Sequence, residues 1–173
     1  LGVAYRYCPG YLPGGRADAT LADDAVSAAR ESDVAVVCVG LPDEDESEGF
    51  DRSDLALPAT HDGLVTRVAA ANPETVVLLC AGAPVLMPWL ASVRAVLCMY
   101  LAGQAGGLAA ADLLTGATNP CGKLAETWPA RYADVPSAGF YETGGRQAQY
   151  REGIYVGYRF YDKARRQVAF PFG

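Results

Sequence analysis

The stretch "VAVVCVGL", residues 34–41, consists only of apolar residues and one glycine. Such continuous runs are typical of strands that are buried on both faces, whereas a strand with one wet face alternates apolar and polar residues. Two later runs, "TVVLLCAG" (75–82) and "RAVLCMYL" (94–101), have the same character. The three runs predict core strands at 34–40, 75–81 and 95–100 that lie parallel to one another.

Helical patterns fill the intervals between these runs. Residues 20–33, 60–72 and 103–116 repeat small or apolar residues at helical spacing, with Thr20 as a plausible N-cap of the first helix. A β-rich segment, "VAYRYC" (3–8), precedes them. This alternation predicts an α/β fold: a three-layer α/β/α sandwich with a mostly parallel, doubly wound sheet and right-handed crossovers.

The composition narrows the classes of protein that fit. The chain has 173 residues, 51% of them hydrophobic and 20% charged, which suits a single folded domain over 1–173 and argues against disorder. No apolar run approaches the ~20 residues of a membrane helix, so no membrane span is predicted. The net charge of −6, without a basic patch, argues against a nucleic-acid partner.

The cysteine count predicts free thiols rather than a disulfide framework. Five cysteines, an odd number, lie at wide spacings without a C-x-x-C pair. Three of them fall within the predicted strands, where a thiol packs as a small hydrophobe. We therefore expect Cys38, Cys80 and Cys98 to be buried on neighbouring strands. Reduced thiols are typical of a cytoplasmic protein, and nothing else in the sequence bears on location.

The strand at 34–40 leads into a strongly acidic loop, "LPDEDESEGFDRSD" (41–54). Its net charge equals that of the whole chain, because one arginine faces seven acids. In open α/β sheets, ligands bind at the carboxyl ends of the strands. The loop is therefore either a functional site or a solvated surface segment. The acids are Asp43, Glu44, Asp45, Glu46, Glu48, Asp51 and Asp54.

Most site chemistries fit this loop poorly. A calcium loop needs oxygen ligands at fixed spacing, and a glycine stands where the next ligands should be. His61 is the only histidine, which leaves too few ligands for zinc and no partner for a serine triad, and a lone histidine at a helix start is typically a surface or capping residue. The segment "LAGQAGG" (101–107) lacks the phosphate-loop lysine. No metal and no cofactor is predicted, and acid–base work by a crowded carboxylate remains open.

Four motifs occur in the order of a known family. They are "VGLPDEDESEGFDRSDLALP" (39–58), "NPETVVLLCAGAPVLMPWL" (72–90), "YLAGQAGGLAAADLLTGATNPCGKLAETWP" (100–129) and "YREGIYVGYRFYD" (150–162) followed by "FPFG". Together they resemble the second, α/β-sandwich domain of glycoside hydrolase family 3, the β-glucosidase family. The resemblance covers roughly residues 30–173.

The resemblance implies an activity and a site. Glu48, the glutamate before glycine in "SEG", matches the family's acid/base, with Glu46 as the runner-up, and Asp51 and Arg52 match the "DR" that shapes the loop or binds substrate. The implied reaction is retaining hydrolysis of a β-linked glycoside without a cofactor. The nucleophile would come from an N-terminal barrel domain, whose Ser-Asp-Trp motif this sequence lacks. We therefore expect a truncated piece of a larger multidomain hydrolase, without the barrel and the family's first strand, and inactive alone.

Two alternatives stay open from the sequence. The chain could be a non-catalytic α/β module that binds a sugar or another small ligand, or a flavodoxin-like nucleotide-binding domain. For the leading interpretation we expect the loop 42–54 to be mobile and Glu48 to be well exposed, because the partner domain that would cover the loop is absent.

Overall fold

The computed structural model describes residues 3–49, 51–141 and 147–173. The chain divides into two compact units. The first comprises Leu1–Ala83 and Met87–Pro120, and the second comprises Pro84–Leu86 and Cys121–Gly173. Among the helices of the described residues, none is long and apolar enough to cross a membrane.

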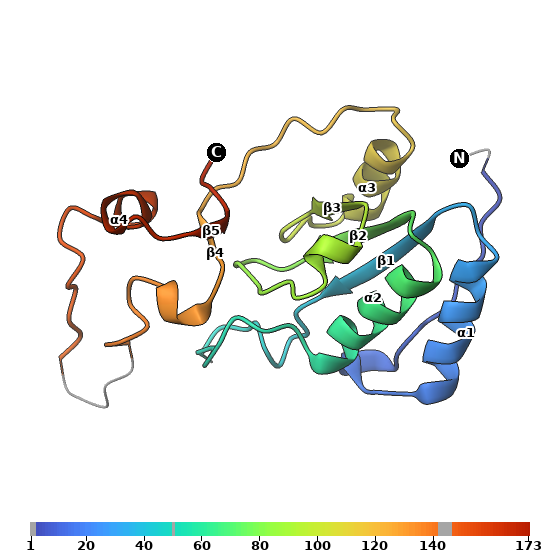
Figure 1. The fold of residues 1–173 in the computed structure, drawn as a ribbon, viewed down its shortest axis with the longest axis horizontal. Coiled ribbons are helices and arrows are strands. Elements are labelled where there is room, and N and C mark those ends of the chain that lie inside the picture. Colours follow the sequence, from blue (N-terminus) through green and yellow to red (C-terminus); the bar gives the residue numbers. More distant parts are fainter. Residues whose placement is uncertain (1–2, 50, 142–146) are drawn as a thin grey trace. The chain divides into compact units, whose positions relative to one another are not determined.

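The first unit is built on a parallel sheet. Strands β1 (Ala35–Gly40), β2 (Thr75–Cys80) and β3 (Ala95–Cys98) lie in the order β1-β2-β3 (Figure 1). Both pairs are parallel, with Ala35 opposite Thr75 and Val76 opposite Ala95. The predicted parallel core strands are confirmed, each to within two residues of its expected end. Tyr100, at φ +48°, adopts a left-handed backbone just beyond β3.

Helices α1 (Ala19–Arg30), α2 (Ala59–Ala71) and α3 (Gly106–Leu114) follow the predicted pattern. The cap of α1 is Asp18 rather than Thr20, because its carboxylate accepts the Leu21 N–H at 3.0 Å. Short 3-10 helices lie at η1 (Pro13–Gly15) and η2 (Leu90–Ser92). With the parallel sheet, these helices make the first unit an α/β sandwich.

The core of this unit lies between the sheet and α2. Alternate side chains of β1 and β2 point into it, because successive residues of a strand face opposite sides. From the strands it contains Val37, Val39, Val77 and Leu79, and from α2 it contains Leu64, Val65 and Val68. Helix α1 packs against α2 and contributes Ala28 and Ala29 to the core.

The predicted burial of the strand cysteines is wrong. All five cysteines belong to the described residues and are free, but Cys38 and Cys80 are exposed and Cys98 is only half-buried. Cys38 alternates with the buried Val37 and Val39, so its side chain points to the sheet face away from the core. An apolar run on its own does not show which of its residues turn toward the covering helices.

The β-rich segment 3–8 forms no strand. Its Tyr5 and Tyr7 side chains are 91% and 80% exposed. Strand propensity mostly reflects packing against neighbouring strands. This segment pairs with no strand of the described sheet, and its strand propensity alone is therefore not enough to make it a strand.

The second unit contains an antiparallel pair of short strands. These are β4 (Trp128–Pro129) and β5 (Val168–Phe170), accompanied by the 3-10 helix η3 (Tyr132–Asp134) and by α4 (Tyr158–Ala164). The fully buried side chains of this unit include Trp128.

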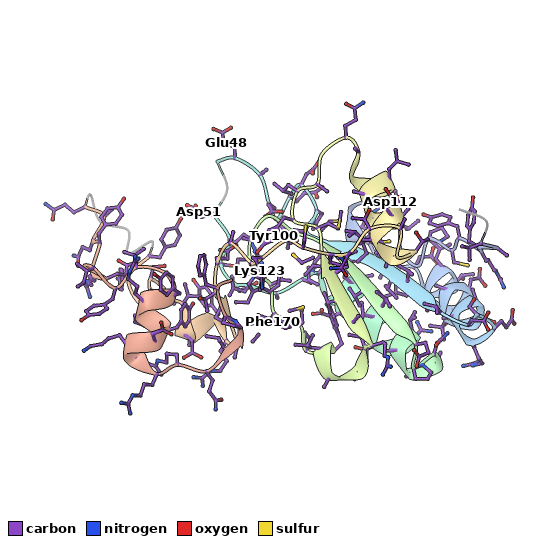
Figure 2. The ribbon with its side chains drawn as sticks, turned by 90° about the horizontal axis from the view of Figure 1, so that it is seen from above. Glu48, Asp51, Tyr100, Asp112, Lys123 and Phe170 are labelled. Carbon is purple, nitrogen blue, oxygen red and sulfur yellow. The ribbon has the colours of Figure 1, made fainter. Side chains whose placement is uncertain are left out.

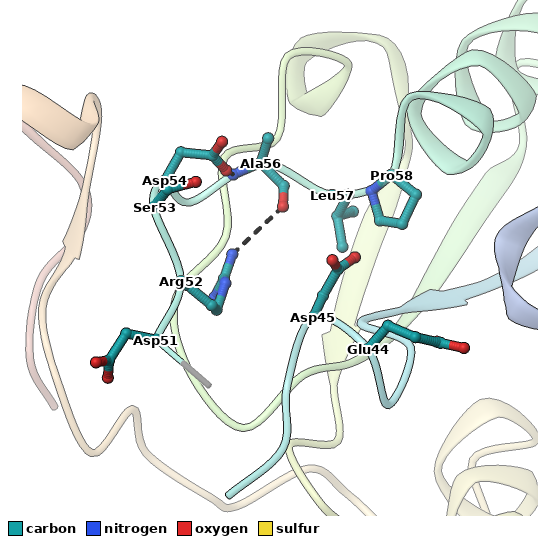
Figure 3. Close-up of a pocket in the computed structure, with 9 residues that line it drawn as sticks. All are labelled: Glu44, Asp45, Asp51, Arg52, Ser53, Asp54, Ala56, Leu57 and Pro58. Atoms are coloured by element: carbon teal, nitrogen blue, oxygen red, sulfur yellow. Dashed lines mark hydrogen bonds between the residues drawn. The ribbon is translucent and has the colours of Figure 1, made fainter. Parts of the chain in front are cut away.

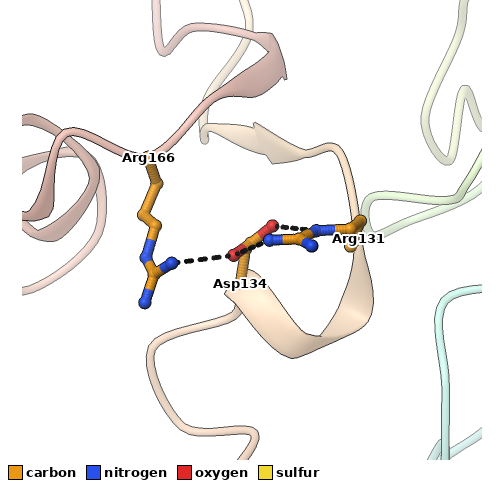
Figure 4. Close-up of polar contacts among 3 residues, drawn as sticks. All are labelled: Arg131, Asp134 and Arg166. Carbon is orange, nitrogen blue, oxygen red and sulfur yellow. Dashed lines mark hydrogen bonds and ion pairs between the residues drawn. The ribbon is translucent and has the colours of Figure 1, made fainter.

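The second unit contains a cluster of charged side chains around Asp134, which is only 5% exposed (Figure 4). Arg131 donates to its carboxylate from Nε at 2.8 Å and from Nη2 at 2.9 Å, and Arg166 Nη1 lies 3.6 Å away. The hydrogen bonds from Arg131, followed by the two positive charges, hold the pKa of Asp134 below its ordinary value. The charged carboxylate thus ties η3 to the segment that follows α4.

Candidate active site

The acidic loop 41–54 starts from a rigid base at the end of β1. The Leu41 N–H donates to the Cys80 carbonyl at 3.1 Å, which continues the pairing of β1 with β2 by one residue. The Pro42 carbonyl then accepts the N–H groups of Asp45 (2.9 Å) and Glu46 (3.0 Å). Residues 42–46 therefore form a closed turn directly on the carboxyl edge of the sheet.

Glu48 lies beyond this turn and is exposed, as predicted. Figure 2 shows its side chain at the top of the loop, pointing away from the strands. The next residue, Gly49, has φ +88°, a backbone conformation that glycine adopts without strain. The expected mobility of the loop stays a prediction, and Phe50 lies outside the described residues.

Glu46 has a different environment from Glu48. It is half-buried, and both of its carboxylate oxygens accept the N–H of Gly82 at 2.9 Å. Gly82 lies just past β2, on the neighbouring strand end. The two glutamates that the sequence left as candidates are therefore distinguished by their contacts, since one is tied to the sheet and the other is presented to solvent.

A small pocket of about 300 Å³ lies between the two halves of the loop (Figure 3). Arg52 Nη2 donates to the Ala56 carbonyl at 3.3 Å, and Asp54 Oδ1 accepts the Ala56 N–H at 2.8 Å. In Figure 3 the Arg52 side chain is turned toward Ala56, while the Asp51 carboxylate points the other way. These contacts fit a loop-shaping role for Arg52, which stays a prediction together with that of Asp51. The lining residues are Glu44, Asp45, Asp51, Arg52, Ser53, Asp54, Ala56, Leu57 and Pro58.

His61, in the first turn of α2, is a buried support of this loop, and the expectation of a surface or capping residue is wrong. It is 4% exposed, and its Nδ1 lies 2.9 Å from the Gly40 carbonyl at the root of the loop. Because a carbonyl only accepts, Nδ1 carries the proton. Nε2 is buried and has no hydrogen-bond partner among the residues that the structure describes, and the ring packs on Tyr11 at 4.3 Å between centroids. Sequence spacing gave no signal for this contact, because Gly40 and His61 lie 21 residues apart.

Burial sets the protonation of this histidine. Desolvation lowers the pKa of His61, while the Gly40 hydrogen bond and the charges of Asp62 and Asp45 act in the opposite direction. Asp62 is itself fixed, since Trp89 Nε1 donates to its Oδ1 at 2.7 Å, and burial raises the pKa of that carboxyl. The start of α2 therefore holds a neutral imidazole against the backbone from which the acidic loop leaves.

We expect acidification to weaken the first unit through His61. Because the folded pKa is lowered, the unfolded chain takes up the proton first, near the ordinary histidine pKa of about 6.5. The stabilisation is therefore complete above that pH and is lost as the pH falls toward the folded pKa. Urea unfolding of the chain at about pH 7.5 and about pH 5.5 measures the loss.

Two variants control this experiment. His61→Ala should lower the free energy of unfolding by about 1–3 kcal/mol at neutral pH, because it leaves the Gly40 carbonyl without its donor. His61→Gln should keep a donor but remove the titrating group, so the pH dependence should shrink. An unchanged pH dependence in His61→Gln would assign the acid sensitivity to other groups.

The chemistry that the loop offers is proton transfer by a carboxylate. In residues 3–49, 51–141 and 147–173, no cluster of three or more histidine, cysteine, aspartate or glutamate side chains is arranged to hold a metal ion. Retaining glycoside hydrolysis needs two carboxyls about 5–5.5 Å apart, one acting as acid/base and the other as nucleophile. Glu48 is presented to solvent beyond the carboxyl edge of the sheet, and the acid/base role expected for it stays a prediction.

Comparison with known proteins shows which family this chain resembles. The family model described as the glycosyl hydrolase family 3 C-terminal domain matches residues 9–158. Thermostable beta-glucosidase B of Acetivibrio thermocellus is 46% identical over 168 residues, which are 96% of this chain and 22% of that protein. An exo-alpha-(1->6)-L-arabinopyranosidase of Bifidobacterium longum is 39% identical over 174 residues, or 99% of this chain and 23% of that protein.

Comparison with solved structures also finds beta-glucosidases. A GH3 beta-glucosidase of Bifidobacterium adolescentis superposes with a TM-score of 0.91 at 41% identity, covering 99% of this chain and 26% of that one. A beta-glucosidase of Kluyveromyces marxianus in complex with glucose has a TM-score of 0.86 at 40% identity, covering 90% of this chain and 19% of that one. The chain thus spans about a quarter or less of the length of these relatives.

Proposed function

This chain belongs to the glycosyl hydrolase family 3 C-terminal domain family, and on that basis we propose that it is the acid/base-bearing domain of a retaining, β-glucosidase-like hydrolase of O-glycosyl bonds. Glu48 is the acid/base. The observation that carries the assignment is the contrast between the exposed Glu48 and the half-buried Glu46, whose oxygens both contact Gly82.

The proposed mechanism divides the two carboxylates between two domains. A carboxylate of the barrel domain attacks the anomeric carbon, and Glu48 gives its proton to the leaving glycosidic oxygen as that bond breaks. In the second step Glu48 takes a proton from water, whose oxygen attacks the anomeric carbon and releases the barrel carboxylate. The partners are therefore a β-linked glycoside and the barrel domain of the same parent chain, and no cofactor takes part.

The contacts of Arg52 support the same role for the loop. Its guanidinium reaches across to the Ala56 carbonyl, while Asp54 caps the Ala56 N–H, so the returning half of the loop is held in a turn. A loop that is fixed at both of its ends and exposes a glutamate between them suits a carboxylate that must enter a cleft from outside. Asp51 and Arg52 shape this loop or contact the sugar.

A domain exchange tests the proposal. The matching 168-residue stretch of the Acetivibrio enzyme is replaced by this chain, giving a protein that we call the chimera. We expect the chimera to hydrolyse an aryl β-glucoside, because the exchanged domain brings its own acid/base to the foreign barrel. The unmodified Acetivibrio enzyme is the control. A chimera that is folded, as judged by circular dichroism, but inactive would favour a non-catalytic sugar-binding module instead.

A further inference from the structure

The contact between Glu46 and Gly82 assigns a role to a residue that the proposed reaction does not itself use. Both oxygens of Glu46 lie 2.9 Å from one backbone N–H, that of Gly82. We propose that Glu46 is a positioning residue: this contact, the Glu46–Gly82 clamp, fastens the acidic loop to the end of β2 and thereby places Glu48. The catalytic consequence rests on the proposed function, whereas the clamp itself does not.

The donor side of the clamp is rigid. Gly82 follows Ala81, which is completely buried, and β2 is the central strand of the sheet. A hydrogen bond to an ionised carboxylate is shorter and roughly twice as strong as one between neutral groups. The acceptor side is rigid too, because the Glu46 N–H is bonded to the Pro42 carbonyl at 3.0 Å. The clamp therefore joins two fixed points of adjacent strand ends.

Gly82 leaves room for this contact only because it has no side chain. A β-carbon at this position would lie 2.8 Å from Glu46 Oε1 and 3.1 Å from Leu101 Cδ1. Leu101 follows β3, whose pairing with β2 continues as Met99 donates to the Leu79 carbonyl at 2.8 Å. The segments that follow the three strands of the parallel sheet thus meet at Gly82, and any larger residue there has to displace Glu46 or Leu101.

The position of Glu48 depends on this anchor. Glu48 follows Glu46 by two positions, and an extended chain spans at most about 3.3–3.6 Å per residue, so the Glu48 Cα lies within roughly 7 Å of the Glu46 Cα. Because the clamp fixes Glu46 to the end of β2, it also limits where Glu48 can lie relative to the sheet. Misplacing a catalytic group by about 1 Å can cost about 10²-fold in rate. Loosening the clamp should therefore lower the rate of the chemical step while leaving the acid/base itself in place.

Removing the clamp from either side should give the same kinetic defect in the chimera. We expect Glu46→Ala and Gly82→Ala each to lower kcat by about 10–100-fold with a smaller change in KM, measured on an aryl β-glucoside with a poor leaving group. The kcat of the double variant should be no lower than that of the less active single variant, since both changes break the same contact. Glu46→Gln, which keeps an acceptor oxygen, should lose less. Asp43→Ala, which removes an exposed acid of the same turn, is the matched control and should keep full activity.

Azide separates positioning from acid–base chemistry. Azide attacks the glycosyl intermediate without needing a base, so it rescues variants that lack the acid/base. It should not rescue Glu46→Ala, in which Glu48 is still present. Rescue of Glu46→Ala together with full activity of Glu48→Gln would make Glu46 the acid/base and overturn the positioning role. Full activity of both Glu46→Ala and Gly82→Ala, in a chimera that Glu48→Gln inactivates, would overturn it as well.

A measurement on the chain alone tests the clamp independently of activity. In ¹H–¹⁵N spectra, the Gly82 amide proton should move upfield and exchange faster with solvent in Glu46→Ala, with Asp43→Ala as the unchanged control. If the Gly82 resonance is indifferent to Glu46, the clamp does not exist. If the clamp is seen but Glu48→Gln leaves the chimera fully active, the proposed function fails and the clamp stands.

Discussion

Replacing Glu48 with glutamine in the chimera should lower hydrolysis of a β-glucoside with a poor leaving group by about 10²–10⁴-fold. Glutamine is nearly isosteric but carries no acidic proton, so the departing oxygen leaves as an unprotonated alkoxide. The defect should be much smaller for an aryl glucoside whose phenol is a good leaving group, because that bond breaks without protonation. Measuring kcat/KM for both substrates gives the dependence on leaving group.

Two further outcomes bear on this assignment. With the activated aryl glucoside, azide should restore turnover of Glu48→Gln and give a β-glucosyl azide, because the anion attacks the glycosyl intermediate without needing a base. Glu46→Gln should show neither the strong leaving-group dependence nor the rescue. If Glu48→Gln retains full activity on the poor leaving group, Glu48 is not the acid/base. If neither glutamate matters, the acidic loop is a solvated surface segment.

The chain alone should show no hydrolysis of aryl β-glucosides, even of those with activated leaving groups. An acid/base cannot start a retaining reaction, because the first step forms a bond between the anomeric carbon and a second carboxylate. The exposed Glu48 also lacks the enclosing wall that desolvation of a general acid requires. The measurement is release of the aryl alcohol by the pure chain, compared with the same amount of the chimera.

The control for this experiment is a preparation from cells that carry an empty vector, since traces of a host glucosidase would imitate activity. Turnover by the chain that exceeds this background and disappears in its Glu48→Gln variant would contradict the prediction. Such a result would mean that a second carboxylate within the chain can act as the nucleophile.

The sequence by itself determined the parallel core and the place of the acidic loop. Continuous apolar runs at 34–40, 75–81 and 95–100 identified the strands, because strands of parallel sheets are typically apolar along their whole length. The expected burial of both faces does not hold in this chain, since alternate residues of β1 are exposed. The helices between them followed from apolar spacing, a signal that needs no knowledge of distant residues. The motif around Glu48 then placed the candidate acid/base at the carboxyl edge of the sheet.

The tertiary structure decided every feature that depends on a partner distant in the chain. The exposure of Cys38 and Cys80 followed from which sheet face the helices cover. The segment 3–8 is not a strand, because a strand forms only when it pairs with a neighbouring strand.

The supports of the acidic loop also join residues far apart in the sequence. The contact of His61 with the Gly40 carbonyl joins residues 21 positions apart, and the contact of Glu46 with the Gly82 N–H joins residues 36 positions apart. Local periodicity describes which way a residue faces along its own element. Which backbone group it meets is fixed only when the strand ends are brought together by the fold.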